Sequence, residues 1–183
     1  MSQILIFAAI SIPLIIVSWG PLRAVGSHGF YRFFAWEVIL ALIVINGRFW
    51  FHDPFSWYQL VSWTLLIIGL VPLGLGVRAL RASGRPVPER EGDRSLLAFE
   101  KTSALVTTGI YKYIRHPLYS SLLFLAWGVF FKSPSWLGSL LGIVASILLL
   151  ATARADEREC ISFFGNEYRE YMNRTKMFIP SIL

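Results

Sequence analysis

Residues 54–77 read PFSWYQLVSWTLLIIGLVPLGLGV, and this stretch contains no Asp, Glu, Lys or Arg. Two further stretches, residues 1–22 and 133–153, are equally free of these charged residues. A helix needs about 20 apolar residues to cross a hydrocarbon core of about 30 Å, and each stretch reaches that length. We therefore predict a membrane-spanning helix in each of the three stretches.

The composition of the 183-residue chain is that of a single membrane domain. Hydrophobic residues make up 55% and charged residues 15%, whereas soluble domains contain about 25% charged residues. Two shorter apolar stretches, 33–47 and 118–131, complete the predicted membrane segments. We expect an all-α, polytopic protein with about five transmembrane helices, two of them in residues 1–53 and the rest in a catalytic core at 54–183. A soluble enzyme, a disordered regulator and a disulfide-stabilised secreted domain are excluded, and the single cysteine, Cys160, excludes a Cys-rich metal site.

The basic residues predict the orientation of the chain in the membrane. If five helices cross in order, fifteen of the seventeen Lys and Arg residues lie on one side, and Arg48 and Lys132 lie on the other. Basic residues concentrate on the cytoplasmic side of membrane proteins. We expect the N-terminus outside and the long third connection and C-terminal tail in the cytoplasm. The net charge of +6 is thus explained by topology and contact with anionic lipids, and no nucleic acid partner is expected.

Two polar segments of that cytoplasmic side differ in pattern. The third connection, residues 78–116, begins with a Gly-, Pro- and charge-rich loop at 81–94. The tail after the fifth helix is predicted to be an amphipathic helix, because five of its residues recur at three- and four-residue spacing. These residues are Glu157, Ile161, Phe164, Tyr168 and Tyr171.

The densest polar cluster is residues 109–119, GIYKYIRHPLY, where the third connection enters the fourth helix. Pro117 suits the first turn of a helix, so Arg115 and His116 are expected at the mouth of that helix, near Tyr111 and Tyr119. Each residue alone also fits a purely interfacial role, in which Arg reaches the headgroups and Tyr forms an aromatic belt. Their concentration within eleven residues favours a functional site.

Three further features stand out, and the first two are predicted at the same membrane depth as residues 109–119. Asp156 and Glu157 are placed just past the cytoplasmic end of the fifth helix, where the helix dipole disfavours carboxylates and calls for a cationic partner. Gly74 and Gly76 lie near the end of the third helix, where glycines serve either helix packing or close approach of a ligand. Glu37, inside the second segment, is either functional or within reach of the interface. The first two features and residues 109–119 are expected to converge on one site.

These motifs resemble a known family. Residues 105–119, LVTTGIYKYIRHPLY, are similar to the signature of the isoprenylcysteine carboxyl methyltransferase and phospholipid methyltransferase superfamily. The acidic pair, residues 164–171 and residues 178–180 resemble the C-terminal half of that family, and Gly74 and Gly76 match a glycine pair near its cofactor. One difference is Asp156, because the family usually has Glu-Glu at the acidic pair.

The resemblance implies an integral membrane methyltransferase that uses S-adenosylmethionine, bound under a cytoplasmic cap, and a lipophilic acceptor that enters from the bilayer. Glu157 would bind the cofactor's ammonium group or ribose hydroxyls, while His116 and Tyr111 would contact its carboxylate or adenosine. Arg115 would be catalytic and hold an anionic acceptor, with Glu37 as a second acceptor-binding residue. The remaining residues expected at the cofactor are Gly74, Gly76, Gly109, Pro117, Tyr119 and Asp156. No metal is expected, and the acceptor is expected to be a carboxylate, as in isoprenylcysteine, or a lipid amine.

Two alternative functions remain open on the sequence. Membrane sterol reductases have a related C-terminal architecture but use NADPH, and the basic run from Arg78 to Arg94 would suit its extra phosphate. A non-catalytic membrane scaffold would use the glycines and tyrosines only for packing. The Arg-His-Pro-Leu-Tyr form together with the acidic pair favours the methyltransferase.

Overall fold

The computed structural model describes residues 2–83 and 104–180, and most of these are helical. The bounds of the helices are α1 Ser2–Val17, α2 Trp19–Arg23, α3 His28–Asn46, η1 Gly47–Phe49, α4 Trp57–Ser83, η4 Gly109–Lys112, α5 Pro117–Phe130, α6 Trp136–Phe164 and α7 Asn166–Arg174. The all-α class predicted from the sequence is confirmed. The stretch 1–22, expected to be one helix, is divided at Ser18 into α1 and the short α2.

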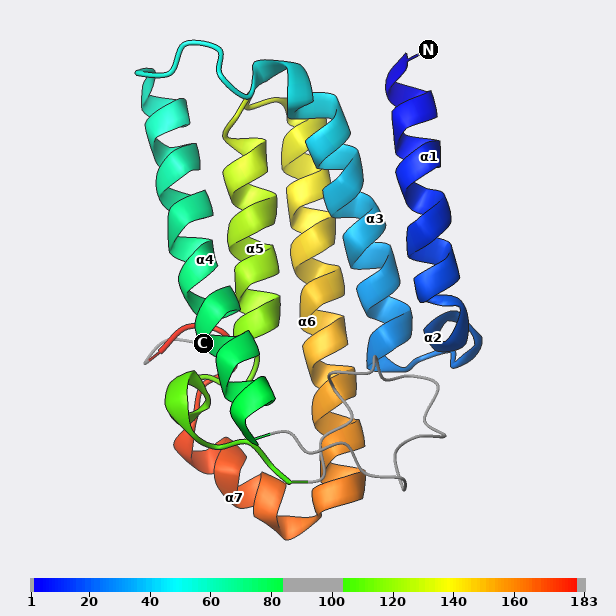
Figure 1. Ribbon diagram of the computed structural model, residues 1–183, viewed down its shortest axis with the longest axis vertical. Coiled ribbons are helices and arrows are strands. Elements are labelled where there is room, and N and C mark those ends of the chain that lie inside the picture. The colour runs from blue at the N-terminus through cyan, green and yellow to red at the C-terminus, as the bar shows by residue number, and fades with distance from the viewer. Residues whose placement is uncertain (1, 84–103, 181–183) are drawn as a thin grey trace.

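Five helices, α1, α3, α4, α5 and α6, run side by side along the long axis of the molecule (Figure 1). Among the described residues, three helical segments are long and apolar enough to cross a membrane: His28–Phe49, Trp57–Ala82 and Trp136–Phe164. The helices α1 and α5 are apolar but have only 16 and 14 residues. The membrane class is thus confirmed, while five complete crossings remain a prediction. The elements α2, η4 and α7 lie at one end of the bundle, called here the site end.

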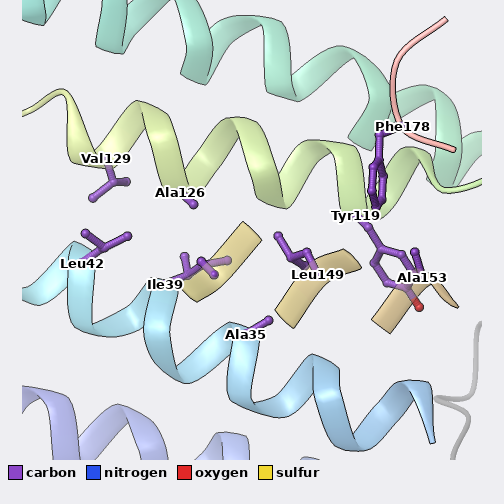
Figure 2. Close-up of a cluster of buried hydrophobic side chains, with 10 residues drawn as sticks. Ala35, Ile39, Leu42, Tyr119, Ala126, Val129, Leu149, Ala153 and Phe178 are labelled. Carbon is purple, nitrogen blue, oxygen red and sulfur yellow. The ribbon is translucent and has the colours of Figure 1, made fainter. Parts of the chain in front are cut away.

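The core is formed where α3, α5 and α6 meet. Small residues on α3 and α6, such as Ala35, Ala145 and Ala153, are fully or almost fully buried and bring these helices together. Leu149 and Tyr119 fill the space between them, and Phe178 from the C-terminal segment closes the core at the site end (Figure 2). The C-terminal residues are therefore part of the same core as the membrane helices.

Glycines bring α4 close to α5. A Cβ atom on Gly69 would lie 2.9 Å from Phe124 Cβ, and one on Gly128 would lie 2.8 Å from Leu66 Cδ2. Neither distance is sterically possible, so these two positions require glycine. Close packing of this kind is how small residues drive helix association in membranes.

The end of the bundle opposite the site holds a buried lysine. Lys132 is 1% exposed, and its ammonium donates to Gln59 Oε1 at 3.1 Å and lies 3.4 Å from the centre of the Trp63 ring. The Gln59 amide in turn donates to the carbonyl oxygens of Phe49 and Lys132. This network replaces the water that the cation would otherwise need, and it ties α4 to the turns that follow α3 and α5.

The helix α6 is longer than predicted, and this changes the position of the acidic pair. Asp156 and Glu157 were predicted to lie beyond the end of the helix, but α6 continues to Phe164, and Gly165, whose φ is +62°, follows it. Both carboxylates therefore lie about two turns inside the helix, and the dipole argument that called for a cationic partner is wrong. The segment continues as helix because it contains no glycine or proline before Gly165.

Candidate functional site

The start of α5 positions the central residues of the site. Pro117 is the first residue of α5, and its fixed φ and missing N–H suit that position. Ahead of it, η4 begins at Gly109, whose φ of +61° favours glycine. This turn buries Tyr111, and the Tyr171 hydroxyl donates to the Tyr111 carbonyl oxygen at 2.7 Å. Arg115 and His116 are thus held between η4 and α5.

The C-terminal segment lies along residues 113–116 and makes backbone hydrogen bonds with them. The Arg115 N–H donates to the Lys176 carbonyl at 2.8 Å, and the Lys176 N–H donates to the Tyr113 carbonyl at 3.1 Å. The Ser120 hydroxyl adds a bond to the Phe178 carbonyl at 2.7 Å. Residues more than 50 positions apart therefore form one wall of the site.

Arg115 joins three parts of the chain. Its Nε donates to Glu157 Oε1 at 2.7 Å, and its Nη1 donates to the carbonyl oxygens of Met172 and Thr175 at the end of α7. The Arg115 and Glu157 side chains are only 9% and 10% exposed. Charge-assisted hydrogen bonds in such a dry setting are strong, so this pair is a structural element of the site as well as a candidate for its chemistry.

His116 lies between the two carboxylates of α6. Its Nδ1 is 3.5 Å from Asp156 Oδ2 and its Nε2 is 3.4 Å from Glu157 Oε1. The imidazole also stacks on the Tyr119 ring, with centroids 5.4 Å apart. Burial alone disfavours the imidazolium, but the hydrogen bonds and negative charges of Asp156 and Glu157 outweigh it and raise the pKa of His116 above 6.5.

Asp156 has weaker contacts than Glu157. Its carboxylate accepts from the Tyr119 hydroxyl at 3.3 Å and from the Cys160 thiol at 3.6 Å, in addition to the 3.5 Å approach of His116. The Asp156 side chain is 24% exposed, compared with 10% for Glu157. Asp156 therefore retains more capacity to accept hydrogen bonds from a ligand, although the sequence analysis favoured Glu157.

The helix α7 covers the site with two tyrosines. Tyr168 and Tyr171 are 3% and 6% exposed. The single tail helix predicted from the spacing is wrong, because the chain turns at Gly165: Glu157, Ile161 and Phe164 lie on α6, and only the two tyrosines form the buried face of α7. Burial raises the pKa of Tyr168 strongly, and the charges of Cys160, Asp156 and Glu157 add to the effect. Its hydroxyl therefore remains protonated beside the acidic pair.

A second pairing at the site end was not found from the sequence. The His28 backbone N–H donates to Glu159 Oε1 at 2.8 Å, and His28 Nδ1 lies 2.6 Å from Glu159 Oε2. These residues are 131 positions apart, and a histidine at the start of an apolar helix has no distinctive local pattern. Only the contact of α3 with α6 brings them together.

The other predicted residues lie in different places. A Cβ atom on Gly76 would lie 3.1 Å from Pro117 Cγ, so Gly76 packs against the start of α5, whereas one on Gly74 would meet nothing within 4 Å. Glu37 is not part of the cluster: its Oε2 accepts from the Ser11 hydroxyl at 2.6 Å, between α1 and α3. Residues 84–94 of the predicted loop lie outside the described residues.

Comparisons with known proteins are consistent with this arrangement. The model of the phospholipid methyltransferase family matches residues 92–167, which include Arg115, His116 and the acidic pair. Methanethiol S-methyltransferase 1 of Bradyrhizobium diazoefficiens is 26% identical over 98% of this chain and 54% of its own length. The protein-S-isoprenylcysteine O-methyltransferase of Schizosaccharomyces pombe is 32% identical over 45% of this chain and 35% of its own length.

A third relative, the methanethiol S-methyltransferase of Pseudomonas deceptionensis, is 28% identical over 40% of this chain and 27% of its own length. The chain thus spans about half the length, or less, of the curated relatives that it matches. No solved structure matches the chain. The three relatives are all named methyltransferases, and none of them is named a reductase.

Proposed function

We propose that this chain is a member of the isoprenylcysteine carboxyl methyltransferase and phospholipid methyltransferase superfamily, whose family model matches residues 92–167. It would transfer a methyl group from S-adenosylmethionine to a small or lipophilic acceptor at the membrane surface. The observation that carries the proposal is the buried cluster of Arg115, His116, Asp156 and Glu157. It lies within the segment that matches the family model, at the end of a bundle of apolar helices.

The residues of the cluster have the chemistry that S-adenosylmethionine requires. The exposed part of Asp156 is suited to the ammonium group or the ribose hydroxyls of the cofactor, while Glu157 holds Arg115 in place. Both ring nitrogens of His116 face Asp156 and Glu157, so a contact with the carboxylate of the cofactor would replace one of these two approaches. The stacked rings of His116 and Tyr119 form an aromatic surface beside these groups.

The reaction itself needs few catalytic groups. When bound, S-adenosylmethionine supplies a methyl group on a sulfonium; the acceptor forms the new bond to carbon as the carbon–sulfur bond breaks and its electron pair stays on sulfur. The protein's main task is therefore to hold the two partners in line, which is worth up to about 7–11 kcal/mol. The buried walls formed by Tyr168, Tyr171 and Phe178 would exclude water from this step.

Arg115 remains the candidate for contact with an anionic acceptor, with one change from the sequence analysis. Because Nε and Nη1 are bound to Glu157 and to the end of α7, bidentate binding of an acceptor by both of these nitrogens would break existing bonds. Among the described residues nothing accepts a hydrogen bond from Nη2. We propose that this nitrogen alone contacts the acceptor.

Two classes of acceptor are supported by the comparisons. The name of the yeast relative favours a prenylcysteine carboxylate, as the sequence analysis did. The Bradyrhizobium relative, which aligns with 98% of this chain, favours a small thiol. A carboxylate is nucleophilic at neutral pH, whereas a thiol, whose pKa is about 8.5 in cysteine and higher in a simple alkanethiol, must first lose its proton.

A parallel transfer assay tests the function and the acceptor together. The purified full chain is incubated with S-adenosylmethionine labelled in the methyl group and, separately, with a prenylcysteine, methanethiol or phosphatidylethanolamine. Transfer to one of these acceptors is expected, with Asp156→Asn as the impaired control. Binding of NADPH in place of S-adenosylmethionine would contradict the proposal and favour the reductase, and binding of neither would favour the scaffold.

A further inference from the structure

The site end of α3 is attached to α6 through one histidine and one carboxylate. Glu159 accepts hydrogen bonds from both the backbone N–H and the imidazole of His28, at 2.8 and 2.6 Å. An ionised carboxylate only accepts, so an ionised Glu159 requires a proton on His28 Nδ1. Because His28 is 1% exposed, the contact with Glu159 and the packing around the ring fix its orientation.

This pair lies next to the proposed cofactor-binding carboxylate. Glu159 follows Asp156 by three residues on α6, so the two side chains share one face of the helix. His116, which precedes α5, lies 3.5 Å from Asp156, while His28, which begins α3, is bound to the next carboxylate on this face of α6.

The two histidines come from different parts of the chain. The segment that matches the family model, 92–167, contains His116, Asp156 and Glu159 but not His28. The contact thus joins the N-terminal helices to a site whose central charged residues, Arg115, His116, Asp156 and Glu157, lie in the matched segment. If His28 does more than attach α3 to α6, the N-terminal helices contribute to the binding of the methyl donor.

We propose that His28 is a positioning residue of the methyl-donor site, which acts through Glu159 to hold Asp156 where a cationic group of the cofactor binds. The inference rests on the proposed function. The alternative is purely structural: Glu159 accepts the first free N–H of α3 and stabilises the N-terminal end of the helix, with no effect on Asp156.

Three variants of the full chain separate these two roles. His28→Asn keeps an N–H donor near the position of Nδ1, whereas His28→Phe keeps a ring and removes the donor. Asn46→Ala is the matched control, because it removes the bond from Asn46 Nδ2 to the Val129 carbonyl (2.9 Å) at the other end of α3. The dissociation constant for S-adenosylmethionine is measured by calorimetry, and the melting temperature is measured beside it.

The positioning role predicts that His28→Phe raises the dissociation constant about tenfold, because a displaced Asp156 would lose most of its charge-assisted hydrogen bond to the cofactor. His28→Asn should retain most of the affinity, and Asn46→Ala should lower the melting temperature while changing the dissociation constant less than about twofold. If His28→Phe does not fold, Glu159→Gln is measured instead, because it keeps an acceptor for the backbone N–H and removes the charge.

Two results would overturn the inference and leave the proposed function intact. One is wild-type affinity in His28→Phe, or in Glu159→Gln if that variant replaces it, with a lower melting temperature. The other is an equal loss of affinity for S-adenosylmethionine in His28→Phe and in one of the two comparison variants, His28→Asn or Asn46→Ala. That result would assign the effect to a general loss of α3 packing. Failure of the wild-type chain to bind S-adenosylmethionine would instead contradict the proposed function, and the inference with it.

Discussion

Arg115 and Glu157 are 42 positions apart in the sequence and are joined by a hydrogen bond of 2.7 Å between buried side chains. The same guanidinium reaches the Met172 and Thr175 carbonyls at the end of α7. One side chain therefore holds the start of α5, the C-terminal part of α6 and the C-terminal segment together. The integrity of the candidate site and the stability of this end of the fold depend on the same residue.

Arg115→Lys should lower both stability and turnover. Lysine keeps the charge but lacks the planar fork that reaches Glu157 and the two carbonyls at once. Loss of one or two such bonds should cost about 1–3 kcal/mol, or several degrees of melting temperature. The control is Arg174→Lys, whose side chain is 76% exposed. Wild-type melting temperature and turnover in Arg115→Lys would contradict both roles of this residue.

The two carboxylates of the acidic pair should respond differently to removal of their charge. Asp156→Asn should weaken binding of S-adenosylmethionine by about ten- to a hundredfold, because a charge-assisted hydrogen bond to the ligand is lost. Glu157→Gln should mainly lower the melting temperature, because Arg115 loses its ionised partner. Calorimetry and thermal unfolding measure the two effects, with the exposed Glu170→Gln as control. If Glu157→Gln instead weakened binding of S-adenosylmethionine and Asp156→Asn mainly lowered the melting temperature, Glu157 would be the cofactor contact.

The raised pKa of His116 predicts a pH-dependent stability. Protonated His116 stabilises the fold through Asp156 and Glu157, so its contribution is complete below the unfolded value of 6.5 and is lost as pH rises through the higher pKa of the folded state. The melting temperature of the wild-type chain should exceed that of His116→Gln most at or below pH 6.5, and the difference should shrink as the pH rises through the raised pKa of His116. A difference that grows with pH would refute this assignment.

The two glycines of α4 should tolerate substitution differently. Gly76→Leu should destabilise the fold, because even a Cβ there would lie 3.1–3.3 Å from Pro117 and Leu118. Gly74→Ala meets no protein atom within 4 Å and should leave the melting temperature unchanged or raise it. A loss of cofactor affinity in Gly74→Ala at unchanged stability would support the predicted ligand contact at Gly74. Unchanged affinity would limit the cofactor site to the α5–α6–α7 cluster.

The orientation in the membrane is tested by two cysteines in a Cys160→Ala background. Ser133→Cys, between α5 and α6, should react with an impermeant reagent added outside intact cells. Ala82→Cys, near the end of α4, should react only after the cytoplasmic face is opened, as the distribution of basic residues predicts. If only Ala82→Cys reacted from outside, the orientation of the chain would be the reverse of the predicted one. Equal labelling of both cysteines would contradict the model in which Ser133 and Ala82 lie on opposite sides of the membrane.

The sequence by itself determined the class of the fold and most of the site. Long charge-free runs predicted membrane helices because the length of an apolar helix must match the bilayer, which is a local property of the chain. The motif at 109–119 predicted that Arg115, His116 and Tyr119 act together because they share one helix start. The family resemblance followed from the same local pattern.

The tertiary structure alone decided which side chains face one another. Whether Glu157 or Asp156 is open to a ligand depends on where Arg115 reaches, and the bond between His28 and Glu159 depends on how α3 packs against α6. Glu37 binds Ser11 and does not join the site, and this likewise follows from the packing of α1 on α3. Such pairings join residues 26 to 131 positions apart, and local periodicity carries no information about them, because it identifies the buried face of a helix but not its neighbour.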